Sequence, residues 1–583
     1  MSLSGTSDLR GVPGGAAVTA ADLAWVALLS GAIFVYAHLP AFTSPFVLND
    51  DVRQQIYWMQ QWLDPELFRN DFLTEYARLY VSWGVKALYW LASWVAGPLT
   101  FAKILPGLLF IWLGVCLFQI GHRLGERTLA WVTLGVYWLM PFFLDNLAGG
   151  LARGFAAPLL ALLWLGWLDR RPWVMGLALL LQALCIPYIF LVGAVAVVLA
   201  GLAGRTGRFR AVPFPARPAH FFLLASGAAL VLLMNLAYQK AGFGPLVSAG
   251  EMAQRPEFTA LGRFPILPVP SLLWELIQPW EFIAPFREGG PVAGAAVTLG
   301  VAFLALIGLF RVDWRALKDR LPPVVWLGLS SVLLYSLARL FLLKLFVPDR
   351  YVIYTVNLFY CLLLALTLNA ALKIGQWPRN LALLALILAA ILGAGRLHWV
   401  GLKDYSAYQP LYAALARTPK DALIAGHPNL MDTVPTLARR RAFATYELAH
   451  PWSRGYWRQL RPRLEELFRA YYAADPREVL AFCRKYQIAF LVVDDRHFRP
   501  DFLRGGWFFF PMEQRVSEDS GPSRFERIET PFFAPFDEQI RRQVAEGSHF
   551  ALLSETIFPT LIVDQHLRLL DMRPWMTQDP SDN

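Results

Sequence analysis

Long apolar segments separated by short polar ones fill the first 400 residues of the chain. We predict twelve membrane-spanning candidates, and several fall short of the roughly 20 apolar residues of a full span, so these must be tilted, broken or re-entrant. The candidates lie near 21–41, 79–97, 101–121, 128–144, 154–168, 173–187, 188–204, 219–238, 291–310, 321–346, 351–372 and 380–397. The pattern therefore predicts a polytopic α-helical membrane domain over residues 1–400, with about eleven to thirteen transmembrane helices.

Arg and Lys in the connecting loops orient these candidates. Twelve Arg and Lys against three acids lie in the loops 169–172, 205–218, 311–320 and 373–379, and seven against eleven lie in the loops 42–78 and 239–290. Because positive charge favours the cytoplasmic side, we place the first four loops in the cytoplasm and the loops 42–78 and 239–290 outside.

The number of candidates before residue 170 does not fit this orientation. Either one segment between 79 and 168 is re-entrant, or 173–204 forms a single bent helix. We favour the first, since a helix that long would exceed the ~30 Å hydrocarbon core.

From about residue 401 the pattern changes to that of a soluble α/β domain. Ala422–Ala425 and Ala489–Val493 are short apolar runs typical of buried strands, whereas Arg454–Ala474 and Pro476–Tyr486 carry apolar residues at helical spacing. We expect this domain, residues 401–583, on the extracytoplasmic side of the cytoplasmic (inner) membrane.

The composition supports a membrane protein and disfavours nucleic-acid binding. Charged residues make up 16 % of the chain and the mean hydropathy is +0.42, whereas soluble domains carry about 25 % charged residues. The net charge of +10 comes from residues dispersed in short loops, which is a topology signal rather than a basic groove. Four cysteines without close spacing, and the absence of a phosphate-binding loop or dinucleotide motif, argue against a disulfide framework, a Cys-based zinc site and nucleotide-driven chemistry.

The first outer loop carries an adjacent acidic pair, Asp50 and Asp51, soon after the first span. Two neighbouring carboxylates repel each other, so we expect a cationic partner, and such a carboxylate can accept a proton from an acceptor hydroxyl. The alternative is a solvated acidic loop whose Asp caps a helix. The apolar residues of 56–62 predict that this helix is amphipathic and lies along the membrane interface.

Basic residues at two other outer turns are candidates for binding a lipid phosphate. Arg153 follows Asp145 in one turn, and Arg350 follows Asp349 in the other. A guanidinium offers forked donors that match phosphate oxygens. The alternatives are a side chain that reaches the headgroups for Arg153 and a local ion pair with Asp349 for Arg350.

The long outer loop 239–290 combines Glu257 and Arg263 with Trp274, Trp280 and Phe282. Aromatic rings stack on sugars and also anchor loops at a membrane surface. A substrate lid and an inert interfacial cap are therefore both compatible with this loop.

The order of these features resembles the GT-C superfamily of integral membrane glycosyltransferases. The residues that carry the resemblance are Asn49-Asp50-Asp51-Val52-Arg53 and Leu151-Ala152-Arg153-Gly154-Phe155. Members of that superfamily take sugars from polyprenyl-phosphate or similar lipid carriers on the outer membrane face. The resemblance implies that an acid of the first outer loop, Asp50 or Asp51, is the catalytic base and that transfer inverts the anomeric carbon.

We therefore expect a glycosyltransferase with a lipid-linked sugar donor, a glycan, lipid or protein acceptor, and membrane lipids as partners. The expected catalytic residues are Asp50 and Asp51, and the expected substrate-binding residues are Arg53, Asp145, Arg153, Tyr188, Glu257, Arg263, Arg350 and Tyr351. No cofactor is required; a divalent metal is compatible, and Asp494-Asp495 is an acidic pair at a strand end. The rival functions are a lipid or polysaccharide transporter and a non-enzymatic scaffold for envelope assembly.

Overall fold

The computed structural model describes residues 17–205, 218–258, 263, 264, 266, 268–277, 291–373, 375, 376, 380, 393–500, 534–554, 557, 558 and 560–576. Several sequence features fall outside this part of the chain: residues 206–217 of the loop 205–218, Trp280 and Phe282, and most of the apolar candidate 380–397.

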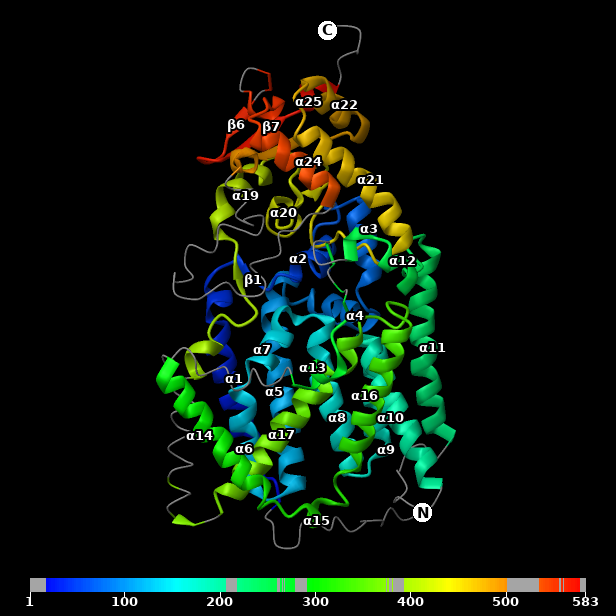
Figure 1. Ribbon diagram of the computed structural model, residues 1–583, viewed down its shortest axis with the longest axis vertical. Helices are drawn as coiled ribbons and strands as arrows, with labels where there is room; N and C mark the ends of the chain where they lie inside the picture. Colours follow the sequence, from blue (N-terminus) through cyan, green and yellow to red (C-terminus); the bar gives the residue numbers. More distant parts are fainter. Residues whose placement is uncertain are drawn as a thin grey trace.

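Helices pack side by side over the first 371 residues, and a sheet-containing C-terminal region, from Lys403 to Met576, covers one end of them (Figure 1). The longer helices are α1 (Ala20–Thr43), α4 (Trp83–Ala92), α5 (Pro98–Leu124), α6 (Arg127–Trp138), α8 (Ala156–Leu168), α9 (Pro172–Cys185), α10 (Pro187–Arg205), α11 (Pro218–Lys240), α14 (Pro291–Leu309), α16 (Pro322–Leu340) and α17 (Ile353–Ala371). Proline begins many of them, because a fixed φ and a missing N–H suit the first helical turn.

Five helices of the described part are long and apolar enough to cross a membrane: Ala20–Thr43, Pro98–Leu124, Phe222–Lys240, Pro322–Leu340 and Ile353–Ala371. Four shorter apolar helices accompany them: Ala152–Leu168, Pro172–Cys185, Pro187–Ala203 and Leu299–Leu309. The predicted multi-pass helical fold is thereby confirmed, with fewer full-length spans than candidate segments.

Not every apolar candidate before residue 170 forms a full span, and this explains why their number does not fit the orientation from the loop charges. Helix α4 has only 10 residues, about 15 Å of helix, so the candidate 79–97 is not a full span. Helix α6 and the segment Pro141–Gly150, which holds α7 (Pro141–Leu147) and the turn η2 (Ala148–Gly150), bend by 65° at their junction. This bend lies between residues 79 and 168, as the favoured interpretation expects. Helices α9 and α10 are also separate, with a break at Ile186.

The apolar residues of the segment after the acidic pair are covered by protein, which the sequence did not indicate. It forms the short helix α2 (Val52–Gln55) and the 3₁₀ helix η1 (Tyr57–Trp62), in which Ile56 and Met59 are fully buried. Gln60 Nε2 donates to Thr436 O at 3.2 Å, so η1 packs against the C-terminal region. An apolar face looks the same in sequence whether lipid or another part of the protein covers it. Helix α3 (Phe72–Tyr80) follows and lies in the same layer (Figure 1).

The C-terminal region contains a mixed five-stranded sheet in the order β4-β3-β5-β7-β6. Its strands are β3 (Leu423–Gly426), β4 (Arg441–Ala442), β5 (Phe490–Asp494), β6 (Thr560–Ile562) and β7 (Leu567–Asp571). Strand β3 runs parallel to β4 and β5, and β7 runs antiparallel to β5 and β6. The two predicted strands are confirmed as β3 and β5.

Helices surround this sheet, and both predicted helices are confirmed as α21 (Arg454–Tyr471) and α22 (Pro476–Tyr486). The shorter elements are η8 (Ser406–Tyr408), α19 (Gln409–Ala416), α20 (Pro428–Met431), η9 (Val434–Ala438), η10 (Asp495–Phe498), α24 (Ala534–Ala545), η13 (Ala551–Leu553) and α25 (Arg573–Met576). The short helices before the C-terminal region are η3 (Ala152–Phe155), α12 (Ala249–Ala253), η4 (Pro256–Phe258), α13 (Leu272–Ile277), α15 (Trp314–Leu317) and η7 (Pro348–Tyr351).

A two-stranded ladder joins the first loop to the start of the C-terminal region. Strand β1 (Val47–Leu48) pairs antiparallel with β2 (Lys403–Asp404), with Leu48 opposite Lys403. This ladder brings the start of the C-terminal region beside the acidic pair of the first loop.

Candidate functional site

Asp50 and Asp51 are half-buried, and each has a cation as its partner. Asp50 Oδ2 lies 2.9 Å from Lys403 Nζ, and the backbone N–H of Asp51 donates to Asp50 Oδ1 at 3.0 Å. Burial alone would raise the pKa of Asp50, but Lys403 and then Arg53 outweigh it and lower this pKa to about 2. Asp50 is therefore a stable anion at neutral pH.

Asp51 joins the first loop to the turn that follows α7. Its Oδ2 forms an ion pair with Arg153 Nη1, and its Oδ1 accepts a hydrogen bond from Gln54 Nε2 at 2.6 Å. Arg153 Nη2 also donates to Asn49 Oδ1 at 3.3 Å. The sequence predicted both residues as site residues, and the structure brings them into contact across 102 positions of the chain.

Two glycines allow this close approach. Gly149 has φ +82°, and a Cβ there would lie 2.9 Å from Asn49 Cβ. Gly401 has φ +69°, and a Cβ there would lie 2.6 Å from Ala148 Cβ. Asn49 Nδ2 donates to Gly401 O at 2.7 Å and ties the same three segments together. A larger residue at either glycine would push the first loop away from Arg153.

Arg153 has one buried donor left over. Its Nε has no hydrogen-bond acceptor among the described residues. Buried donors in native proteins are nearly always paired with protein, water or ligand. This N–H is therefore an unsatisfied buried donor on the side chain that holds Asp51.

Arg53 lies deeper, between two carboxylates of the C-terminal region. Its side chain is 1 % exposed; Nη1 lies 3.4 Å from Asp432 Oδ2 and Nη2 lies 3.3 Å from Glu447 Oε1. Burial raises the pKa of Asp432 to about 7 even though Arg53 opposes the shift. Arg53 thus holds the first loop against the C-terminal region, which is a structural contact rather than an open binding position.

Arg263 and Glu257, both predicted to bind substrate, contact the C-terminal region instead. Arg263 lies 3.9 Å over the ring of Tyr446, and its Nε donates to Tyr446 O at 2.9 Å. Glu257 is fully buried and accepts from Trp457 Nε1 at 3.2 Å, with Arg461 Nη1 at 3.4 Å. Sequence alone could not separate these contacts from a substrate lid, because the partners lie about 180 to 200 positions away.

Arg350 lies at the mouth of α17 with a cluster of tyrosines. Its Nη1 donates to Tyr354 OH at 3.4 Å, and its Nε lies 3.7 Å from Asp349 Oδ2. Tyr188 OH lies 3.4 Å from Tyr354 OH, and the Tyr188 ring lies 6.3 Å from that of Tyr351. Arg350 therefore forms the local ion pair with Asp349, and the two predicted tyrosines, Tyr188 and Tyr351, lie beside it.

Two residues connect this cluster electrostatically to the acidic pair. Burial raises the pKa of Tyr80; Asp51 raises it further and Arg350 lowers it, so Tyr80 lies within the field of both. Asp145 likewise lies in the field of Arg153, Asp50, Asp51 and Arg350. Of the predicted residues, Asp50, Arg153 and Asp145 thus lie near Asp51, and Arg350 acts on Tyr80 and Asp145 from its own cluster.

Lys403, Asp432, Glu447 and Gln54 complete the surroundings of the acidic pair, and the sequence reasoning missed them. Three of them lie more than 350 positions from the loop that they contact, and no local spacing could reveal that contact. Gln54 stands three residues from Asp51, so helical spacing was the one available signal.

Cationic side chains of the chain itself engage the acidic pair. Lys403 and Arg153 already occupy one oxygen of each carboxylate, and the described residues contain no group of three His, Cys, Asp or Glu side chains arranged around a point. The pair Asp494-Asp495 is likewise engaged, by Arg496 at 2.6 Å and by His566 at 3.0 Å.

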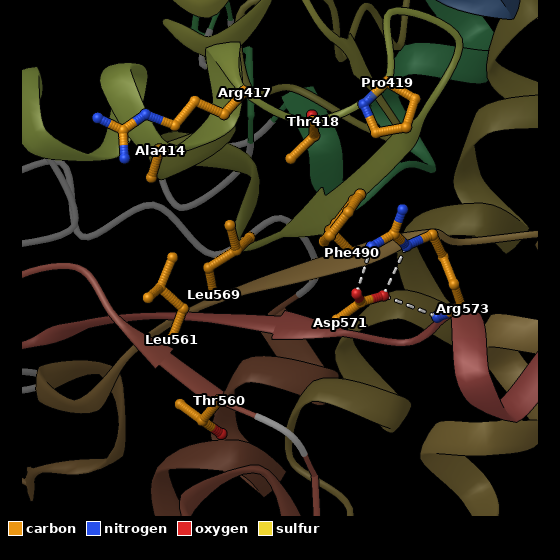
Figure 2. Close-up of a pocket in the computed structure, with 10 residues that line it drawn as sticks. All are labelled: Ala414, Arg417, Thr418, Pro419, Phe490, Thr560, Leu561, Leu569, Asp571 and Arg573. Carbon is orange, nitrogen blue, oxygen red and sulfur yellow. Dashed lines mark hydrogen bonds and ion pairs between the residues drawn. The ribbon is translucent and has the colours of Figure 1, made fainter.

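A separate pocket of about 380 Å³ lies in the C-terminal region, between the end of α19 and the sheet (Figure 2). Asp571 and Arg573 form a two-oxygen ion pair at its wall, with Arg573 stacked 4.8 Å from the Phe490 ring. Its lining residues are Ala414, Arg417, Thr418, Pro419, Phe490, Thr560, Leu561, Leu569, Asp571 and Arg573. None of the predicted site residues lines it.

No family model and no curated protein sequence matches the chain. Solved structures do match. The oligosaccharyltransferase of Archaeoglobus fulgidus in complex with zinc and sulfate shares 12 % identity with a TM-score of 0.50, over 83 % of this chain and 69 % of that one. AglB from the same organism, in complex with an inhibitory peptide and a dolichol-phosphate, shares 11 % identity with a TM-score of 0.50, over 94 % of this chain and 88 % of that one.

ArnT from Cupriavidus metallidurans in the apo state matches with 10 % identity and a TM-score of 0.46, over 96 % of this chain and all of that one. At identities this low, the match to the archaeal oligosaccharyltransferase establishes the fold alone. The resemblance to the GT-C superfamily predicted from the first loop is therefore confirmed at the level of the fold: this chain is a multi-pass membrane protein with a GT-C fold.

Proposed function

We propose that this protein is a glycosyltransferase that moves a sugar from a lipid-phosphate carrier to an acceptor hydroxyl. The proposal draws on the fold shared with AglB, whose structure contains a dolichol-phosphate and a peptide. The charge pattern of the loops supports a site on the outer face of the cytoplasmic membrane, with residues 401–583 on that side. The acceptor belongs to the glycan, lipid or protein class.

The observation that carries the proposal is the state of Arg153. This side chain holds Asp51 and Asn49 with its two terminal nitrogens and keeps Nε as a buried donor without an acceptor in the described part. A phosphate oxygen is an acceptor that forms a strong, charge-assisted bond with such an N–H. Arg153 can therefore bind the carrier phosphate while it still holds the base.

Asp51 is the better base of the acidic pair. A carboxylate has about four lone-pair positions, and Gln54 and Arg153 use two of those on Asp51. Asp50, whose pKa is about 2, is a poor proton acceptor at neutral pH and instead fixes Lys403.

The reaction then needs three changes in bonding. The acceptor hydroxyl transfers its proton to Asp51, its oxygen bonds to the anomeric carbon, and the bond from that carbon to the carrier phosphate breaks. The electron pair stays on the phosphate oxygen. Arg153, with Arg350 behind it, stabilises the negative charge that develops there, and the low dielectric of a buried site strengthens this effect. No step requires a metal.

Cleavage of a labelled donor tests this proposal against the transporter alternative. Membrane vesicles containing the protein are given polyprenyl-phosphate sugars with a radiolabelled sugar, and the transfer of label from the lipid to a product is measured. We expect the wild type to cleave at least one such donor and Arg153→Gln to lower kcat by roughly 10²-fold, the usual cost of losing one donor to a developing anion.

Arg127→Gln is the matched control, because the Arg127 side chain is 60 % exposed and pairs with Asp22 rather than with Asp51, and this variant should retain the wild-type rate. Movement of the intact lipid across the membrane without cleavage would favour a transporter and contradict the proposal. Equal rates in the two arginine variants would remove the role of Arg153.

A further inference from the structure

A chain of buried hydrogen bonds leads away from Asp51 into the C-terminal region. Gln54 Nε2 donates to Asp51 Oδ1 at 2.6 Å, and Gln54 Oε1 lies 3.1 Å from His450 Nε2. His450 Nδ1 in turn lies 2.8 Å from Tyr76 OH. Gln54, His450 and Tyr76 are all buried, so water does not substitute for any of these partners.

The chain continues to the membrane helices. Tyr76 OH lies 3.0 Å from Ser453 Oγ, and Ser453 Oγ is also hydrogen-bonded to Tyr238 OH on α11. The chain therefore links a membrane helix, the first loop and the C-terminal region through one line of polar atoms that ends at Asp51.

Chemistry permits only one direction for the protons of this chain. Asp51 is paired with Arg153 and is therefore an ionised carboxylate, which only accepts hydrogen bonds. The NH₂ group of Gln54 must face it, and Glu447 Oε2, at 3.5 Å from the same nitrogen, favours the same orientation. The carbonyl oxygen of Gln54 then faces His450, so His450 must carry its proton on Nε2.

The remaining protons follow in sequence. With its proton on Nε2, His450 has a bare Nδ1, and Tyr76 must donate to it. The oxygen of Tyr76 then accepts from Ser453, and the oxygen of Ser453 accepts from Tyr238. Every donor in the chain thus points toward Asp51, and aligned hydrogen bonds of this kind polarise and strengthen one another.

The His450 ring is also fixed by its neighbours. It stacks on Trp452 at 4.0 Å between centroids and lies 5.0 Å from the ring of Tyr80. Burial, with Arg263 nearby, keeps the pKa of His450 well below its usual range, so the ring stays neutral as the chain requires.

We propose that Gln54 and His450 are positioning residues, which hold Asp51 ionised and correctly oriented through this one-way chain of donors. The proposal rests on the proposed function, in which Asp51 is the base. It adds that the C-terminal region acts on the reaction through His450 and Gln54, without touching the substrate.

Nitrogen NMR tests the chain independently of any activity. The protein is labelled with ¹⁵N-histidine in detergent micelles, and the resonances of His450 are those lost in His450→Gln. We expect a neutral imidazole with its proton on Nε2 from pH 6 to 8. A proton on Nδ1, or an imidazolium, would overturn the one-way chain.

Kinetics test the positioning role. Gln54→Leu and His450→Phe should each lower kcat about tenfold with little change in KM for the donor, and move the acidic limb of the pH–rate profile to higher pH, because the anion loses a donor. His450→Gln keeps an N–H at the position of Nε2 and should restore most of the rate. In an Asp51→Asn background, Gln54→Leu should cause no further loss.

Full activity in His450→Phe would overturn the positioning role. The same holds if Gln54→Leu lowers the rate of Asp51→Asn as much as it lowers the rate of the wild type. Full activity in Asp51→Asn would instead remove the proposed function, and the NMR result would still decide whether the chain exists.

Discussion

Replacing Asp51 with asparagine is expected to lower kcat for sugar transfer by roughly 10²- to 10⁴-fold, the range that a positioned general base contributes. Asparagine keeps the shape of the side chain and removes its ability to accept the hydroxyl proton. The measurement is the initial rate of label transfer from the best polyprenyl-phosphate donor, in membranes with equal amounts of each variant.

Two further variants separate Asp51 from its acidic neighbours. Asp64→Asn changes an acid of the same loop that pairs with Lys420 at 2.8 Å, and it should keep the wild-type rate. Asp50→Asn should lose less than Asp51→Asn and leave the acidic limb of the pH–rate profile in place, because Asp50, with its pKa of about 2, stays ionised throughout the usual assay range. A larger loss in Asp50→Asn than in Asp51→Asn would reverse the assignment of the base.

Replacing Arg53 with methionine is expected to destabilise the protein by about 3–5 kcal/mol, because it leaves buried carboxylates without their cation. Arg53 is 1 % exposed and lies between Asp432 and Glu447. The measurement is thermal unfolding in detergent. Lys485→Met, which breaks a pair with Glu466 in which the two side chains are 57 % and 29 % exposed, should cost about 1 kcal/mol or less.

The loss in Arg53→Met should also depend on pH. Burial raises the pKa of Asp432 in the folded state, and removing Arg53 leaves this shift unopposed. A group with a raised pKa in the folded state favours folding when it is protonated, so the variant should lose stability as pH rises through about 7. We expect a larger deficit at pH 8 than at pH 5; an equal deficit at both would contradict this account of the buried pair.

Features with a strong local pattern could be predicted from the sequence. The apolar runs indicated the multi-pass fold, and β3, β5, α21 and α22 follow from runs and helical spacing within a few residues. The sequence also indicated that Asp51 and Arg153 could meet, because the loop charges placed both turns on the same side of the membrane.

Contacts that depend on packing between distant segments could not be predicted. Lys403, Glu447 and His450 reach the first loop only because the C-terminal region folds over it, and nothing in their own neighbourhoods indicates this. The same packing explains why the apolar face around Met59 is buried against protein instead of lipid. Periodicity reports that a face is covered but not what covers it.

The proposed reaction depends on Arg153 binding the carrier phosphate beside Asp51. A structure of the full chain with bound polyprenyl phosphate, determined by electron cryo-microscopy, would show whether this contact exists. We expect a phosphate oxygen within about 3 Å of Arg153 Nε, with Asp51 facing the position that the sugar would occupy. The opposite result is a phosphate bound elsewhere, with Arg153 Nε still lacking an acceptor. One such place is the pocket between α19 and the sheet, which Arg417 and Arg573 line.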